Sequence, residues 1–189
     1  MIELKYAVLF FLLAGTVLTG YSLWQIRDSH VQTEEKKEEA LEILEASNTE
    51  EPLSLDFQPN ETIGLLTVPK LKKDIPIIEG TDEEQLAAGV GHYLGTAFPT
   101  QRDQIVLSGH RDTVFRQFDQ LELGDIFTVK LPYGEFSYEI YDTKIVDADD
   151  RTIIKSTAPD EILTVTTCYP FSYLGDAPER FIFYAKPID

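Results

Sequence analysis

The sequence contains one cysteine, Cys168, and three histidines, His30, His92 and His110. A single cysteine excludes a disulfide within the chain, so the stability of the fold has to come from packing. One cysteine and three scattered histidines show none of the regular spacings with which zinc sites are built. An acidic loop of the 12-residue calcium-binding pattern is also missing. The sequence therefore predicts no metal site.

Basic residues are scarce as well. Lysine and arginine together number 16 against 33 aspartates and glutamates, which gives a formal net charge of -17. Such a balance argues against binding of nucleic acid, because its phosphates require a basic surface. It also argues against docking onto anionic lipid headgroups. The hydrophobic content of 43% is sufficient for an ordinary packed core, and no internal repeat is visible.

An apolar run without any charge extends from Tyr6 to Ile26. Its length matches the ~20 residues that span the ~30 Å hydrocarbon core of a bilayer as a helix. Tyr6 lies at one end, and Tyr21 and Trp24 lie at the other, where interfacial aromatics are expected. A cleaved signal peptide is the alternative, but its apolar region is usually shorter and ends in small residues. We predict a cytoplasmic tip and transmembrane anchor over residues 1–26.

The flanking charges, Lys5 and Arg27, barely discriminate between the two orientations of this anchor. Residues 27–51 are rich in glutamate and have a composition that favours helix. We interpret them as a solvated acidic stalk or linker that is partly helical. The alternative is a segment that folds back over a functional site.

From residue 52 the composition changes to short apolar stretches separated by Gly, Pro and Asp. The expected strands are 62–68, 75–78, 104–108, 126–130, 136–146, 162–168 and 181–186. Short helical turns are expected at 82–88 and 113–121. Many short strands with closely spaced turn signals favour a β-barrel or sandwich. Residues 52–189 are long enough to form one domain with its own core.

The single thiol lies at the last position of a predicted strand. Tyr169-Pro170 ends that strand, because proline has no N–H to donate to the sheet and restricts the residue before it. Arg180 begins the final strand. If these two strands are antiparallel neighbours, Cys168 and Arg180 lie side by side. His110 also follows a predicted strand, in a Ser-Gly-His-Arg turn.

These three residue types together could perform nucleophilic catalysis. A thiolate attacks carbonyl carbons, an imidazole transfers protons, and a guanidinium donates to a developing oxyanion. With unperturbed pKa values of ~8.5 and ~6.5, roughly 1% of molecules hold thiolate and imidazolium together at pH 7. Each residue alone also has an ordinary explanation: an inert core cysteine, a loop histidine and a surface arginine. The pattern alone leaves both possibilities open.

A family resemblance decides between them. Three separated motifs carry it: the string Leu107-Ser-Gly-His110 through Gly124-Asp125, the segment Thr164-Val-Thr-Thr-Cys168, and Arg180. Together they resemble the sortases, the bacterial cysteine transpeptidases of the cell surface. Two earlier segments, 64–70 and 89–99, are similar to the same family, so the resemblance covers roughly residues 53–187. The usual strand motif is Thr-Leu-x-Thr-Cys, and this chain has Val165 in place of the leucine.

The resemblance implies an all-β fold, an eight-stranded sortase-type β-barrel with short helices. It implies that Cys168 attacks the threonine carbonyl of a Leu-Pro-x-Thr-Gly-like or Ala-containing sorting motif. His110 would transfer protons, and Arg180 would stabilise the oxyanion or position the peptide. The thioacyl enzyme would pass the surface protein to an amine of a cell-wall precursor, with no metal or organic cofactor. Thr167 and His92 are expected to bind substrate, a structural hydrogen bond being the alternative for His92.

The single N-terminal anchor and the run Gly-His-Arg-Asp-Thr-x-Phe-x-x-Phe look most like class D sortases. Pilin-polymerising sortases typically carry a C-terminal anchor and an Asp-Pro-aromatic lid, and neither is found in this sequence. We therefore expect a single-pass membrane protein with an extracytoplasmic catalytic domain. The alternatives are a pilin-polymerising sortase and a membrane-anchored extracellular binding protein that keeps the barrel without turnover.

Overall fold

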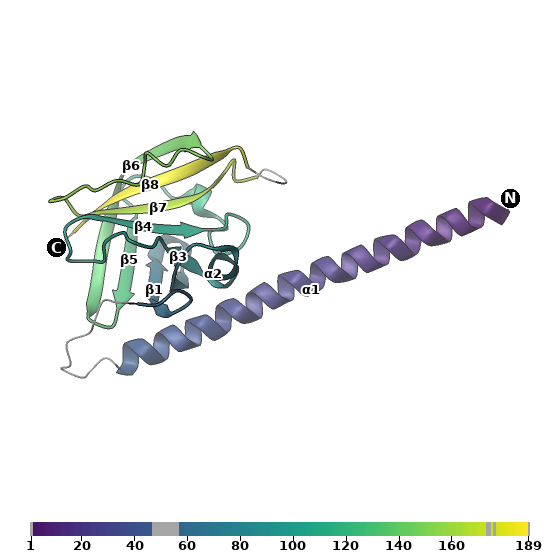
Figure 1. The fold of residues 1–189 in the computed structure, drawn as a ribbon, viewed down its shortest axis with the longest axis horizontal. Coiled ribbons are helices and arrows are strands. Elements are labelled where there is room, and N and C mark those ends of the chain that lie inside the picture. The colour runs from purple at the N-terminus through teal and green to yellow at the C-terminus, as the bar shows by residue number, and fades with distance from the viewer. Residues whose placement is uncertain (1, 47–56, 173–174, 176, 189) are drawn as a thin grey trace.

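A computed structural model of the chain describes residues 2–46, 57–172, 175 and 177–188. Its main body is a closed β-barrel of eight strands, and one long helix extends away from it (Figure 1). The elements in chain order are α1 (Ile2–Ala46), β1 (Thr62–Val68), η1 (Pro69–Leu71), β2 (Lys73–Glu79), α2 (Glu83–Ala88), β3 (Val90–His92), β4 (Gln104–Gly109), η2 (Phe118–Gln120), β5 (Ile126–Leu131), β6 (Gly134–Asp147), β7 (Ile162–Tyr169) and β8 (Glu179–Pro187). The expected boundary between stalk and domain, at residues 51 and 52, lies outside the described residues.

The strand order around the barrel is β1-β2-β3-β4-β7-β8-β6-β5, and β5 pairs with β1 to close it. The pairs β2–β3 and β4–β7 are parallel, and the other neighbours are antiparallel. The predicted β-barrel is therefore confirmed, and all seven predicted strands are present. The strand that the sequence did not reveal is β3, which has three residues and is too short to show an alternating pattern.

The helical turn predicted at 82–88 corresponds to α2. Asp82 and Gln85 form a capping box at its start, in which each side chain bonds to the other residue's backbone. The short helical turn predicted at 113–121 corresponds to a series of tight turns that ends in the 3-10 helix η2. Phe115 and Phe118 are both fully buried there and stack at 4.0 Å between ring centroids. Burial of these rings under the barrel favours tight turns over an amphipathic helix.

The barrel interior is apolar and rich in aromatic rings. Phe118, Phe127 and Phe183 contact one another at ring-centroid distances between 5.9 and 6.2 Å. Val165, where the strand motif departs from the usual leucine, is fully buried in this core. The departure therefore changes the packing beneath the β7 strand and not the exposed surface beside Cys168.

The predicted anchor and stalk form one uninterrupted helix, α1, so the stalk is helical as far as Ala46. Its N-terminal part exposes large apolar side chains, and by length and composition the helix is able to cross a membrane. Its C-terminal part contacts β1, β2 and α2. Ala40 is fully buried in this contact, and the Ser29 hydroxyl donates to the Ala87 carbonyl of α2 at 3.0 Å.

Candidate active site

The ends of three neighbouring strands bring the three candidate residues to one level of the barrel. In the parallel pair β4–β7, Gly109 is opposite Thr167, so the next residues, His110 and Cys168, are level with each other. In the antiparallel pair β7–β8, Cys168 is directly opposite Arg180. The predicted adjacency of Cys168 and Arg180 is thus confirmed. Neighbouring strands are separated by ~4.8 Å, so the three side chains start within reach of one another.

The three side chains also share the outer face of the barrel. Successive residues of a strand point to opposite faces, and the residues that β4, β7 and β8 contribute to the main core cluster inside the barrel carry odd numbers: Ile105, Leu107, Leu163, Val165, Phe183 and Ala185. Cys168 and Arg180 carry even numbers and point outward, and His110 does so when the alternation of β4 is continued. All three are half-buried. The thiol is therefore held by the sheet and open to a peptide from outside.

Arg180 is oriented by its own loop. Its Nη1 donates to the carbonyl of Ala177 at 3.2 Å and to that of Glu179 at 3.0 Å. Within the described residues, Nε and Nη2 make no further hydrogen bond. A guanidinium fixed in this way keeps two donor groups for a substrate carbonyl or an oxyanion, and it stays charged at every working pH.

The structure corrects the expectation that the Thr167 side chain binds substrate. This side chain is buried on the core side of β7, and its hydroxyl donates to the Gly109 carbonyl at 2.8 Å. The bond joins β7 to β4 one residue before Cys168 and His110. Thr167 therefore positions the two strand ends against each other, and its side chain is not accessible to a peptide.

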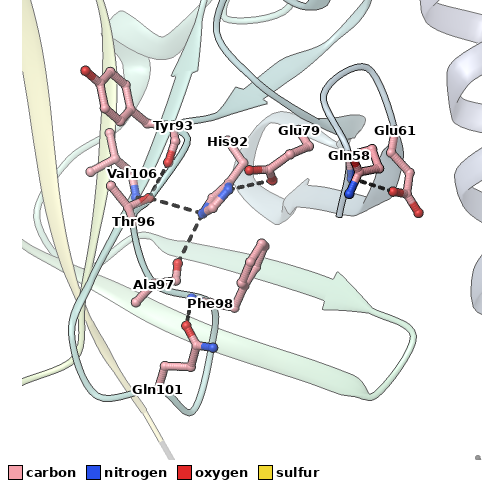
Figure 2. A network of polar contacts seen from close by, with 10 residues as sticks. All are labelled: Gln58, Glu61, Glu79, His92, Tyr93, Thr96, Ala97, Phe98, Gln101 and Val106. Atoms are coloured by element: carbon pink, nitrogen blue, oxygen red, sulfur yellow. Dashed lines mark hydrogen bonds and ion pairs between the residues drawn. The ribbon is translucent and has the colours of Figure 1, made fainter. Parts of the chain in front are cut away.

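For His92 the structure favours the second of the two stated possibilities, a structural hydrogen bond (Figure 2). Its Nδ1 lies 2.7 Å from Glu79 Oε2, and its Nε2 lies 3.1 Å from both the Ala97 carbonyl and Thr96 Oγ1. The ring also stacks on Phe98 at 4.3 Å between centroids, and the residue is 1% exposed. Both ring nitrogens are engaged and the side chain is buried, so the structure offers no His92 group to a substrate. It fits the structural hydrogen-bond alternative, because it holds β2, β3 and the loop after β3 together.

Arg111 is a residue of the site that the sequence did not reveal. Its Nη1 donates to the Pro170 carbonyl at 3.1 Å, and its Nη2 donates to the Gly175 carbonyl at 2.8 Å. The fork of the guanidinium thus joins the turn that follows His110 to the loop that follows Cys168. Its position beside His110 in the sequence was visible, but backbone acceptors in a distant loop leave no sequence signal.

Glu83 is a second such residue. Its Oε1 lies 3.7 Å from His110 Nε2, and it comes from the first turn of α2. The Glu83 side chain is largely exposed, so water screens its interaction with His110.

A cavity of ≈ 1090 Å³ lies next to the site, between the barrel and α1. One wall is formed by the loops that follow His110 and Cys168, and the other by α1 residues between Ser29 and Lys37. Lys73 lies in this wall and donates to the carbonyls of Val114 and Arg116 at 3.1 and 2.6 Å. Burial lowers the pKa of the Lys73 ammonium, and the nearby positive charge of Arg116 lowers it further. The part of α1 that follows the apolar run thus borders the edge of the barrel that carries His110 and Cys168.

A thiol, an imidazole and a guanidinium placed across three strand ends of a closed barrel are what a cysteine acyltransferase needs. Comparison with known proteins identifies the group. The Sortase domain family matches residues 66–188. Sortase D of Bacillus subtilis (strain 168) is 45% identical over 195 residues, which cover 97% of this chain and 98% of that protein. The chain belongs to the sortase family and is a cysteine transpeptidase.

Solved structures agree with this assignment. A Clostridium perfringens sortase D5 transpeptidase has 25% sequence identity and a TM-score of 0.63, covering 83% of this chain and 89% of that one. Streptococcus agalactiae sortase C1 has 26% identity and a TM-score of 0.64, covering 82% and 89%. The sortase-type barrel is thus confirmed, and the B. subtilis relative supports the resemblance to class D.

Proposed function

We propose that Cys168, His110 and Arg180 carry out transpeptidation on a sorting signal. The Cys168 thiolate attacks the carbonyl carbon of the motif threonine and forms a C–S bond. Arg180 donates to the oxyanion that develops on the carbonyl oxygen. The C–N bond to the following residue then breaks, and the His110 imidazolium gives its proton to the departing amine. The products of this half-reaction are a thioester on Cys168 and a free C-terminal fragment.

The second half-reaction restores the enzyme. An incoming amine gives a proton to the neutral His110 imidazole and attacks the thioester carbonyl. A new C–N bond forms, the C–S bond breaks, and the Cys168 thiolate and His110 imidazolium are regenerated together. The observation that carries this proposal is the strand register, which places all three residues at one level and on one outer face.

The substrates in this proposal follow from family membership. The sorting signal is a Leu-Pro-x-Thr motif followed by Gly or Ala, cleaved after the threonine. The acceptor is an amine of a cell-wall precursor, so the product is a surface protein linked to the cell wall. The position of the three residues on the outer face of the barrel, each half-buried, supports a substrate that approaches from outside. The chemistry uses side chains alone, without a metal ion or organic cofactor.

The placement of the protein belongs to the same proposal. Residues 1–26 form the cytoplasmic tip and the single membrane anchor, 27–51 the acidic stalk, and 52–189 the catalytic domain outside the cell membrane. The apolar N-terminal part of α1 supports the anchor. The extracytoplasmic orientation rests on the location of the cell-wall acceptor.

Cleavage of a fluorogenic sorting peptide by the full-length protein in detergent tests the proposal. We expect Cys168→Ala and thiol alkylation each to abolish cleavage, since no other residue of the chain is a thiol. A library of peptides that vary between proline and threonine then defines the motif. Unchanged cleavage by the Cys168→Ala variant would favour the alternative, a binding protein without turnover.

A further inference from the structure

The cavity of ≈ 1090 Å³ between α1 and the barrel is rich in basic residues, although the chain as a whole is acidic. In the whole chain acidic residues outnumber basic ones 33 to 16. In the lining of this cavity the basic residues outnumber the acidic ones, and they are Lys37, Lys72, Lys73, Arg111 and Arg116. The balance of charge is therefore reversed at this place.

The charges of the two signs also differ in burial. Lys37, Lys73 and Arg111 are half-buried, whereas the acidic residues of the lining are all exposed: Glu34, Asp74, Asp112 and Asp119. Water screens an exposed carboxylate strongly and a half-buried charge less. The cations therefore contribute more to the electrostatic potential inside the cavity than the carboxylates do.

Lys73 and Arg116 are the centre of this basic lining. Lys73 Nζ donates to the carbonyls of Val114 and Arg116, which uses two of the three N–H groups of an ammonium. The two positive charges are close enough that Arg116, after burial, lowers the pKa of Lys73. Within residues 2–46, 57–172, 175 and 177–188, neither of them forms an ion pair with a carboxylate. An anion bound between them would relieve their repulsion and accept hydrogen bonds from both.

The same cavity extends to the edge of the barrel that carries His110 and Cys168. Arg111 and Tyr169, which directly follow these two residues, belong to its lining. The cavity thus lies beyond the ends of β4 and β7, next to the outer face on which the sorting peptide approaches. A molecule bound at Lys73 and Arg116 has its other end near the thioester on Cys168.

From this arrangement, and on the basis of the proposed function, we infer that the cavity binds the incoming amine through an anionic group of the same molecule. Lys73 and Arg116 hold a carboxylate or a phosphate, both of which guanidinium and ammonium groups bind well. Lys72 and Lys37 add positive charge, Lys37 from the wall that α1 forms. The amine at the other end then attacks the thioester carbonyl. The acceptor class is thereby narrowed to amines that also carry negative charge.

Matched pairs of amines test this inference with the full-length protein in detergent. Aminocaproic acid is compared with its carboxamide, and aminohexyl phosphate with aminohexanol, so that each pair differs in the anionic group. Shorter and longer homologues of each pair cover other distances between amine and anion. Mass spectrometry quantifies the transfer product formed from the sorting peptide. We expect kcat/KM for the anionic acceptor to exceed that for its neutral partner about fivefold, as for partly screened charges, and the pair with the larger ratio identifies the preferred anion.

Variants of the cavity lining show whether the preference comes from these cations. We expect Arg116→Gln to lower the ratio of anionic to neutral acceptor to less than twofold and Arg116→Lys, which keeps the charge, to retain most of it. Lys70→Gln is the matched control, because Lys70 pairs with Glu122 and Asp125 and is not part of the lining. It removes the same charge nearby and should leave the ratio unchanged. Since each ratio compares two acceptors on one protein, a general loss of activity does not affect it.

The possible failures are distinguishable. No cleavage of the sorting peptide by the unaltered protein, or no transfer to any amine, refutes the proposed function and the inference with it. Cleavage and transfer with equal kcat/KM for anionic and neutral amines of every length overturn the inference alone. A preference for anionic amines that is the same in the Arg116→Gln variant also overturns it, because the anion is then bound elsewhere.

Discussion

The hydrogen bond from Thr167 to the Gly109 carbonyl gives the sharpest prediction about the site. Thr167→Val keeps the shape of the side chain and removes the hydroxyl that donates at 2.8 Å. A buried hydrogen bond contributes about 1 kcal/mol to stability, and the loss is larger if the acceptor stays unpaired. For a protein of this size that corresponds to a decrease in Tm of about 2–4 °C.

The expected effect on catalysis is larger than the effect on stability. The bond joins the residues that directly precede His110 and Cys168, so its loss lets the two strand ends move relative to each other. A displacement near 1 Å costs about 10²-fold in rate when reacting groups must be aligned. We expect kcat on the fluorogenic peptide to fall about 10- to 100-fold with little change in KM, and Thr167→Ser to restore most of it.

Thr164→Val is the matched control on the same strand. Thr164 is fully buried, and its hydroxyl oxygen accepts from the Gln104 side chain at 2.9 Å, so one β4–β7 side-chain bond is again lost. This bond lies at the start of β4, at the opposite end of the strand from His110, so we expect a similar decrease in Tm with kcat within twofold of the unaltered protein. The reasoning is refuted if both variants lose kcat equally, or if Thr167→Val lowers only Tm.

Three further predictions follow. Arg180→Lys should lower kcat/KM at least tenfold in the peptide assay, because an ammonium lacks the planar fork, and unchanged activity would make Arg180 a surface charge. Arg111→Ala should lower kcat by about tenfold with partial rescue in Arg111→Lys, whereas a change in Tm alone would assign it a purely structural role. Hydrogen bonds from the backbone N–H groups of Gln104 and Thr157 lower the pKa of Asp103, so its contribution to stability is complete above about pH 4 and is lost as pH falls through its folded-state pKa. Asp103→Asn should therefore reduce the decline of Tm with falling pH below pH 4, and an unaltered decline would contradict this.

Local signals in the sequence predicted much of the fold. Alternation and turn residues located seven strands, and chain connectivity alone placed Cys168 beside Arg180, because antiparallel neighbours joined by one loop must meet at its ends. The position of His110 was harder to predict. It depends on the parallel pairing of β4 with β7, which are separated by two other strands in the chain. Local pattern gives no information on such a long-range pairing.

The expectations for Thr167 and His92 differ from the structure for separate physical reasons. Thr167 lies next to Cys168 in the sequence, but neighbouring residues of a strand point to opposite faces, so the side chain enters the core. His92 lies on β3, a strand too short to be recognised, and its buried partner Glu79 comes from β2. Arg111 and Glu83 were missed because their partners are brought near only by the closed barrel.

The short helix α2 lies between α1 and His110 and contacts both. Its last turn accepts the hydrogen bond from Ser29 of α1, and its first turn carries Glu83 beside His110. Six residues of helix transmit a displacement over about 9 Å with little bending. A soluble fragment prepared without α1 would lose this support. Activity measured on such a fragment therefore describes a protein in which α2 has lost its contacts with α1.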